Sequence, residues 1–272
     1  MLTTKAIAIF MAVKATKGLS PRTLTEYQYK LAMFANTHPK LPQKVKPIES
    51  FLVQTGPSLD TRDTYYRLLR NFYNVLMRRM IVSSNPIRLI EAPKVPRKVA
   101  RSLTPAQLGQ LLHCLHLRPQ VRAFLFLLAD TGVRLSEALS VTPCSANGVV
   151  ITVTGKTGER EVPISPQVRQ MVLDALPWPW ATYYTASRAV RRAFGDAGIT
   201  GPRASAQSLR HTFCRSWDGD ETLLQGIMGW TSLKMLQVYR PYSLQRAIAQ
   251  HRDNSPVNRI NGHSLPLFSP QV

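Results

Sequence analysis

The sequence predicts a mainly α-helical protein of two domains, with a small antiparallel β-sheet in the second domain. Several segments repeat apolar residues every three or four positions, which is the period of a helix buried on one side. Two β-type runs, VVITV and REVPI, flank the glycine-containing sequence TGKTGE, as in a hairpin. Between the two halves lies EAPKVPRKVAR, a basic segment whose closely spaced prolines exclude a helix. We therefore expect a helical domain (1–90), a linker (91–101), a second domain (102–254) and a tail (255–272).

The charge balance indicates a polyanionic partner. Of the 272 residues, 35 are Lys or Arg and 15 are Asp or Glu, so the formal net charge is +20 and the pI is about 10.5. This excess favours binding to DNA, to RNA or to an acidic membrane surface, and charge alone does not separate these three.

The sequence contains no pattern typical of a membrane span, a secretion signal or a metal site. The longest apolar run, AFLFLLA at 123–129, is too short to cross a bilayer, and no basic and apolar signal opens the chain. We therefore expect a soluble, cytoplasmic protein. Cys114, Cys144 and Cys214 are odd in number and lack a C-x-x-C spacing, so we expect neither a disulfide nor zinc, and each cysteine should pack as a small core residue.

Three helices are expected in the first domain. Ser20 caps a helix that starts at Pro21 and runs to about His38, since the missing proline N–H costs nothing in a first turn. A proline-containing loop and a short helix through Phe51 follow, and then a long helix runs from about Leu59 to Ile81.

The long helix should bury one stripe and expose basic residues. Its apolar residues recur at gaps of three and four, and they are Tyr65, Leu69, Phe72, Leu76 and Met80. Its arginines lie largely off that stripe, and they are Arg62, Arg67, Arg70, Arg78 and Arg79. Each arginine alone is most simply a solvated side chain, whereas the set is better explained by phosphate contacts.

The second domain should begin with two helices. Thr104 and Gln107 form a capping box around a first-turn proline, and the apolar residues of the helix that follows are Leu108, Leu111, Leu112 and Leu115. The segment Gln120–Asp130 is apolar nearly all round, so it should lie in the core and stop at Gly132.

A hairpin and two more helices should complete the middle of the second domain. The hairpin places Lys156 in its turn, and Ser165 and Pro166 start a helix that the PWPW sequence near Pro177 ends. A helix over Thr185–Ala197 should bury Ala189, Val190, Ala193 and Phe194 and should expose Arg188, Arg191 and Arg192.

The stretch 207–242 carries the most specific motif of the chain. It reads QSLRHTF, then a short loop, then MGWTSLKMLQVYRPY, and Tyr239 follows Trp230 by nine residues. With Arg134 in TGVRLSEAL and Lys156 in GKTG upstream, this order resembles the tyrosine recombinase (phage integrase) family. The motifs are specific together and weak singly. Gln207 departs from the family pattern, because it stands where the family usually has histidine.

The resemblance implies a role for each motif residue. Tyr239 would be the nucleophile that attacks a DNA phosphate, and Lys156 would protonate the departing 5′ oxygen. Arg134, Arg210 and Trp230 would stabilise charge on the phosphate. Glu137 would orient Arg134. Gln207 would hydrogen-bond the phosphate without exchanging a proton, and His211, one turn along, would partly replace the missing histidine.

Each of these residues also has a simpler interpretation. Arg134 and Glu137, three residues apart, form an ordinary helical ion pair, and Lys156 is a solvated hairpin lysine. In the simpler interpretation Trp230 is a residue that anchors the core. The same side chain can be both a core residue and a phosphate ligand. His211 is more simply a structural residue.

The resemblance also implies an architecture and partners. Residues 1–90 would be a helical domain that clamps DNA, and 102–254 would be the catalytic domain. Further DNA contacts would come from basic residues of the linker and of the helix near residue 190, namely Lys94, Arg97, Lys98, Arg188, Arg191 and Arg192. The family acts as a homo-tetramer on double-stranded DNA with inverted-repeat half-sites, exchanges C-terminal segments, admits accessory DNA-bending proteins and requires neither metal nor ATP. Residues after Tyr242 are the candidates for that exchange.

Three functions therefore compete. The first is a site-specific recombinase of a phage, transposon or other mobile element. The second is a DNA-binding protein that kept the fold without catalysis, which Gln207 favours. The third is a relaxing enzyme of the type IB topoisomerase kind, which shares the tyrosine chemistry.

Overall fold

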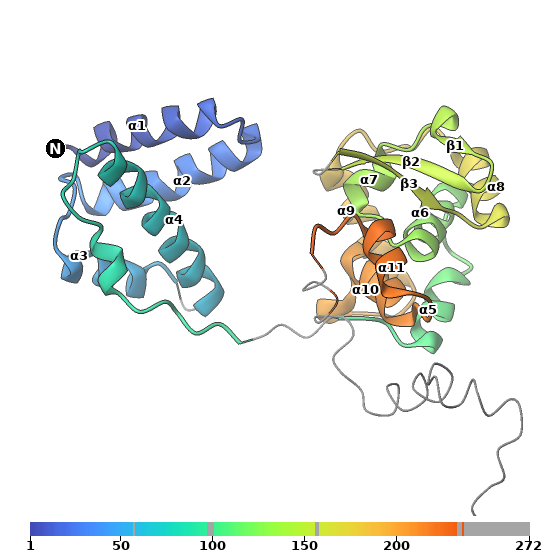
Figure 1. Ribbon diagram of the computed structural model, residues 1–272. Helices are drawn as coiled ribbons and strands as arrows, with labels where there is room; N and C mark the ends of the chain where they lie inside the picture. Colours follow the sequence, from blue (N-terminus) through green and yellow to red (C-terminus); the bar gives the residue numbers. More distant parts are fainter. Residues whose placement is uncertain (57, 97–100, 156–157, 233–235, 237–272) are drawn as a thin grey trace, which may run out of the picture. The chain divides into compact units, whose positions relative to one another are not determined.

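The computed structural model describes residues 1–56, 58–96, 101–155, 158–232 and 236. It divides into two compact units, Met1–Arg97 and Lys98–Val272 (Figure 1). Each unit has its own buried core. The mainly helical fold with a small antiparallel sheet is confirmed. The linker over 91–101 and the tail over 255–272 stay predictions, because residues 97–100 and 237–272 lie outside the described part.

The first unit is built from helices only within its described residues. Its elements are α1 (Thr3–Thr16), α2 (Pro21–Thr37), α3 (Val45–Gln54), α4 (Leu59–Arg78) and the 3-10 turn η1 (Pro86–Leu89). Helix α1, which the sequence prediction lacks, packs against α2 and α4 and brings Phe10 into the core. There Phe10 meets Phe72 of α4 edge to face, with ring centroids 5.5 Å apart.

Helix α4 confirms the buried stripe except at its end. Tyr65, Leu69, Phe72 and Leu76 are buried, whereas Met80 is 92% exposed. The helix ends at Arg78, and Met80 takes a φ of 55°. The amides of Met80 and Ile81 donate to the carbonyls of Met77 and Leu76, which is the Schellman pattern that closes a helix. The chain therefore turns away one residue before Met80 could join the stripe.

The second unit combines helices with a small sheet that lies at one side of it (Figure 1). Its helices are α5 (Pro105–Leu112), α6 (Pro119–Thr131), α7 (Leu135–Leu139), α8 (Pro166–Ala175), α9 (Tyr183–Asp196), α10 (Ala206–Ser216) and α11 (Glu221–Met228). The 3-10 turns η2 (Pro143–Ser145) and η3 (Gly201–Arg203) complete them. Helix α6 packs against α8, α9 and α10, and most of its apolar side chains are buried, as predicted for a core helix. Val121, Phe126 and Ala129 are half-buried. It ends at Gly132, whose φ is 63°.

The predicted hairpin is confirmed. The antiparallel sheet has the order β1 (Ala146–Asn147), β2 (Val150–Gly155) and β3 (Gly158–Pro163). Ile151 and Val153 of β2 and Val162 of β3 are fully buried and join the core of the unit. Gly155 pairs with Gly158, so Lys156 belongs to the connection between them, and Lys156 itself lies outside the described residues.

The start of the second unit confirms one local prediction and corrects another. Thr104 and Gln107 form the capping box, with hydrogen bonds of 3.1 and 3.2 Å in its two directions. The helix ends at Leu112, however, so Leu115, which was predicted to belong to it, lies outside and is 86% exposed. Leu115 therefore lies beyond the last turn that could direct it to the core.

Two further expectations are wrong. The short loop expected before the MGW motif contains helix α11, whose first turn is capped by Asp220 through the amides of Thr222 and Leu223. Of the cysteines, Cys214 is buried and Cys114 is half-buried, but Cys144 is exposed because it lies in the surface turn η2. Among the described residues, no helix combines the length and the apolarity that a membrane crossing requires.

We expect Gly132→Ala to destabilise the protein by several kcal/mol. A Cβ at Gly132 would lie 2.6 Å from Phe213 Cδ1 and 2.8 Å from Met228 Cε. Overpacking of this kind costs about 1–3 kcal/mol, in addition to about 1–2 kcal/mol for the left-handed backbone. The measurement is the urea midpoint of the variant.

Gly148→Ala is the matched control for this substitution. Gly148 has a φ of 59° in the same unit, and a Cβ there would meet nothing within 4 Å. It should therefore show the backbone term alone. Equal losses in the two variants would mean that Gly132 is not sterically confined.

Candidate active site

Arg134 is held at the start of α7 by a buried carboxylate. It occupies the N-cap position, one residue before the helical turn in which it was expected. Its backbone N–H donates to Glu137 Oε2 at 2.7 Å, and its Nη1 donates to Glu137 Oε1 at 2.8 Å. The Arg134 side chain is 40% exposed, whereas that of Glu137 is fully buried. The ion pair required by both interpretations of Arg134 is therefore present, and it leaves part of the guanidinium accessible.

Glu137 has a second cationic partner, Arg160 of β3, which the sequence prediction missed. The Arg160 Nη1 and Nη2 atoms each donate to one Glu137 oxygen at 2.9 Å, and its Nε donates to the Ile227 carbonyl at 3.0 Å. A signal was present in the sequence, because Arg160 is two residues before the buried Val162 and so shares its face of the strand.

These contacts set the protonation state of Glu137. Burial by itself would raise the pKa of this carboxyl, but hydrogen bonds from Arg160 and Arg134 outweigh burial and lower the pKa to about 2. Glu137 is therefore a carboxylate at every pH at which the protein is expected to work.

Arg210 of α10 is buried and joins the ends of two helices. It is 2% exposed, its Nη1 donates to the Gly132 carbonyl at 2.8 Å, and its Nη2 donates to the Met228 carbonyl at 3.0 Å. Helices α6 and α11 both end at these carbonyls. Arg210 is thus held to the carbonyl of Gly132, which precedes Arg134 by two residues, where the chain passes from α6 into α7.

Trp230 combines a core position with a contact to Arg210. It is 8% exposed and belongs to a small cluster with Cys214, Leu224, Met228 and Leu236. The Arg210 Cζ atom lies 5.9 Å from the centroid of its ring, within cation–π range. The structure thus shows the anchor role of Trp230 and places its ring beside one of the two predicted phosphate-binding arginines.

Gln207 and His211 differ from Arg210 in exposure, although α10 carries all three. Gln207 is exposed and His211 is half-buried. Burial, followed by the charges of Arg210 and Arg101, lowers the pKa of His211 below its usual value, so the neutral imidazole predominates at neutral pH. The single helical face expected to present all three residues is therefore divided between solvent and core.

The described residues next to the two remaining motif positions, Gly155 and Leu236, pack against the residues above. A Cβ on Gly155 would lie 2.5 Å from Glu137 Oε1, so the base of the hairpin that carries Lys156 rests directly on the Arg134–Glu137 pair. Leu236, 4% exposed, packs in the Trp230 cluster and precedes Tyr239 by three residues, a chain length of roughly 10 Å. Tyr239 itself lies outside the described residues.

Comparison with known proteins adds independent evidence. No protein-family model matches the chain. The chain is 25% identical to the tyrosine recombinase XerC of Lactobacillus leichmannii over an alignment that is 285 positions long with its gaps and covers 90% of this chain and 96% of the relative. It is 24% identical to the tyrosine recombinase XerD of Yersinia pestis, and this match covers 88% of this chain and 93% of the relative. The chain is a tyrosine recombinase.

A solved structure shares the fold of this recombinase. It is that of a lambda integrase tetramer bound to a Holliday junction. The TM-score is 0.72 at 16% identity, and the match covers 85% of this chain and 78% of the lambda integrase chain.

The basic residues predicted to contact DNA are mostly accessible. Those that are exposed are Arg67, Arg70, Arg78, Lys94, Arg188, Arg191 and Arg192. Arg62 is half-buried, because its Nε donates to the Gly56 carbonyl at 3.1 Å, and Arg67 pairs with Asp63 at 2.9 Å. Arg97 and Lys98 lie outside the described residues. Contact of these residues with DNA stays a prediction.

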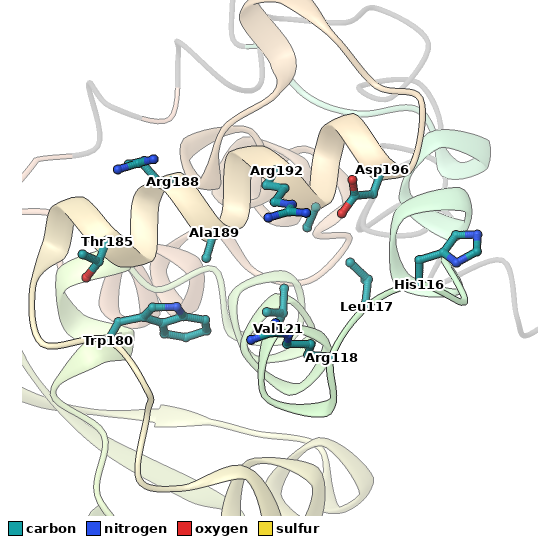
Figure 2. Close-up of a pocket in the computed structure, with 11 residues that line it drawn as sticks. His116, Leu117, Arg118, Val121, Trp180, Thr185, Arg188, Ala189, Arg192 and Asp196 are labelled. Atoms are coloured by element: carbon teal, nitrogen blue, oxygen red, sulfur yellow. The ribbon is translucent and has the colours of Figure 1, made fainter.

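A cavity of about 450 Å³ lies between α9 and the start of α6 (Figure 2). Arg188, Arg192 and Ala189 line it on the α9 side, so Ala189 is half-buried here instead of packed in the core as predicted. Arg118 and Val121 line it on the α6 side. None of the predicted catalytic side chains contributes to its wall, so the cavity is separate from Arg134 and from Arg210.

The described residues contain no group of three or more His, Cys, Asp or Glu that could hold a metal ion.

The buried cysteine beside Arg210 is not a reactive thiol. Burial raises the pKa of Cys214 to about 11, so the thiolate form is scarce at neutral pH.

We expect the buried carboxylate to make the recombinase sensitive to acid. Because the folded pKa of Glu137 lies below its ordinary value of 4.5, its contribution is complete above pH 4.5 and is lost as the pH falls toward 2. Its size is on the order of 3 kcal/mol. Glu137→Gln should therefore lower the urea midpoint at pH 7 and flatten its fall between pH 4.5 and 2.

The exposed Glu161 of β3 provides the matched control. Glu161→Gln should keep the acid profile of the wild type. If Glu137→Gln also kept the wild-type slope, the carboxylate would not be the group that links folding to pH.

Proposed function

We propose that this site-specific recombinase cuts and rejoins DNA through a covalent bond between Tyr239 and a 3′ phosphate, and that it needs neither metal nor ATP. The observation that supports the proposal best is the meeting of the motif segments at one place. Arg134 follows Gly132, Arg210 donates to the Gly132 carbonyl, and Gly155 lies against Glu137. The segment before Tyr239 packs beside Arg210 through Trp230 and Leu236.

In the cleavage step, the phenol oxygen of Tyr239 forms a bond to phosphorus as it loses its proton, and the bond from phosphorus to the 5′ oxygen breaks. Lys156 gives the departing 5′ oxygen a proton. In the joining step, the 5′-hydroxyl of the partner strand attacks the phosphotyrosine and releases Tyr239. The bond energy of the phosphodiester is kept in the phosphotyrosine, so no ATP is consumed.

Charge stabilisation falls mainly to the arginines. Arg134 is the more accessible of the two, because its side chain is 40% exposed while Arg210 is 2% exposed. Its planar guanidinium stays charged at all relevant pH values and can hold two phosphate oxygens. Arg210 adds a second fixed positive charge from inside the fold, and Trp230 beside it would donate its indole N–H to the phosphate.

Gln207 and His211 would modify the rate. Gln207 is exposed on α10 and would donate a hydrogen bond to a phosphate oxygen. It cannot exchange a proton, and the loss of a general acid or base typically slows a reaction about 10²–10⁴-fold. The lowered pKa of His211 means that its imidazole is neutral at neutral pH and able to accept a proton. The alternative is that His211 has a purely structural role.

The partner of the recombinase in this proposal is double-stranded DNA with inverted-repeat half-sites. The net charge of +20 and the exposed arginines of α4 and α9 fit a protein that contacts phosphates from both of its units. The related lambda integrase forms a tetramer on a Holliday junction, and we propose a tetramer on DNA here as well. Exchange of the segments after Tyr242 between subunits, and accessory DNA-bending proteins, belong to the same proposal.

Covalent capture tests the nucleophile. A nicked, randomised DNA pool is incubated with the wild type, with Tyr239→Phe and with Tyr242→Phe as the matched control. Because only the phenol oxygen can form the bond, the wild type and the control should give SDS-resistant adducts and Tyr239→Phe none. The captured sequences define the target site.

Two other results would overturn this proposal. Tight, sequence-selective binding without adducts would leave a DNA-binding protein that has lost catalysis. Relaxation of supercoiled DNA with no exchange between two captured sites would indicate a topoisomerase-like enzyme.

A sulfur substitution tests the acid role of Lys156. Lys156→Ala should slow cleavage of ordinary DNA by about 10²–10⁴-fold, the usual size of a general-acid effect. A substrate with sulfur at the 5′ bridging position should be cleaved at nearly the wild-type rate, because a thiolate leaves without a proton. Rates are measured in single turnover on the captured site. Equal slowing on both substrates would remove Lys156 from this role.

A further inference from the structure

Arg160 has the geometry of a residue that serves Glu137. Both of its Nη atoms donate to the two carboxylate oxygens at 2.9 Å, which is the paired arrangement of an arginine fork. Arg134 donates to the same two oxygens, through its Nη1 and its backbone N–H. One buried carboxylate is therefore shared by two arginines from different elements, α7 and β3.

The charges of these three side chains decide what a phosphate would experience. Arg134 and Glu137 alone form a pair with no net charge, which attracts a phosphate only weakly. Arg160 adds one positive charge, and its side chain is 13% exposed, so this charge is held close to the carboxylate. The group as a whole has one net positive charge, and the accessible part of it is Arg134.

Arg160 is also tied to the segment that leads to Trp230. Its Nε donates to the Ile227 carbonyl at 3.0 Å, near the end of α11. A Cβ on Gly229 would lie 3.2 Å from the same Nε, so the chain passes directly over the guanidinium. The side chain thus has little freedom to leave Glu137.

We propose that Arg160 is a positioning residue of the cleavage reaction. It neutralises Glu137, so that Glu137 orients Arg134 without cancelling the charge that Arg134 offers to the scissile phosphate. The inference rests on the proposed function, because it concerns the rate of the cleavage step assigned to Tyr239.

A purely structural role for Arg160 makes a different prediction. If Arg160 only stabilised the fold, its loss would slow cleavage of every substrate by the same factor. If it acts through the charge of Arg134, the loss should depend on the charge of the substrate phosphate. A methylphosphonate, in which a methyl group replaces one non-bridging oxygen, is neutral before the attack and has one negative charge fewer than a phosphodiester in the transition state, so it separates the two roles.

The test compares single-turnover cleavage of two synthetic DNAs that carry the captured site, one with a phosphodiester and one with a methylphosphonate at the cleaved position. Arg160→Met should slow phosphodiester cleavage by about 10–100-fold, less than the 10²–10³-fold typical of a donor that touches the developing charge. On the methylphosphonate, the loss relative to the wild type should be about threefold or less. Arg134→Ala should show the same dependence on substrate.

Arg169→Met is the matched control. Arg169 is a half-buried arginine of α8 that donates to the Ala146 carbonyl at 3.3 Å through Nε and at 3.2 Å through Nη2. It contacts a backbone oxygen instead of a carboxylate. Any effect of its loss should be equal on the two substrates.

A double variant covers the case in which Arg160→Met does not fold. Arg160→Met combined with Glu137→Gln has one net positive charge, as in the wild type, and leaves no buried carboxylate with a single partner. It should cleave the phosphodiester faster than Arg160→Met, or fold where the single variant does not.

The outcomes separate this inference from the proposed function. Wild-type cleavage with equal losses for Arg160→Met on both DNAs would overturn the positioning role and leave the recombinase mechanism intact. The positioning role would also be overturned if a folded double variant cleaved the phosphodiester no faster than a folded Arg160→Met. The same holds if the double variant cleaved both DNAs more slowly than the wild type by an equal factor. No cleavage by the wild type would overturn both.

Discussion

The catalytic half of the molecule depends on one buried carboxylate. Glu137 is fully buried and ionised, and a charge in that position is stable only when hydrogen-bonded cations surround it. The two cations come from the start of α7 and from β3. Gly155, at the end of β2, also packs against this carboxylate. Glu137 is therefore the common contact of the hairpin and of Arg134.

Much of the fold is readable from the sequence because it follows local rules. The buried stripe of α4, the capping box of α5 and the antiparallel hairpin all depend on residues close to one another in the chain. The failures have the opposite character. Periodicity does not forecast that Met80 adopts a left-handed conformation, which residues other than glycine rarely take. Helix α11 was missed because its eight residues are too few to show a clear period.

The site shows the same division between local and distant information. The spacing of Arg134 and Glu137 predicts their contact, since three residues separate neighbours on a helical turn. Arg160 lies 23 residues from Glu137 and Arg210 lies 78 from Gly132, so these contacts follow only from the tertiary fold. Motif spacing therefore identifies candidate side chains, while their hydrogen-bond partners and their exposure come from packing.

The anchoring of Arg210 has a consequence for how sequences of this kind can diverge. Arg210 donates to the backbone carbonyls of Gly132 and Met228, and every residue type supplies such an oxygen. A change of side chain at position 228 leaves the acceptor in place as long as the helix end is kept. At positions 132 and 228, the conformation of the backbone therefore limits which substitutions keep these two hydrogen bonds, and the chemistry of the side chain matters less.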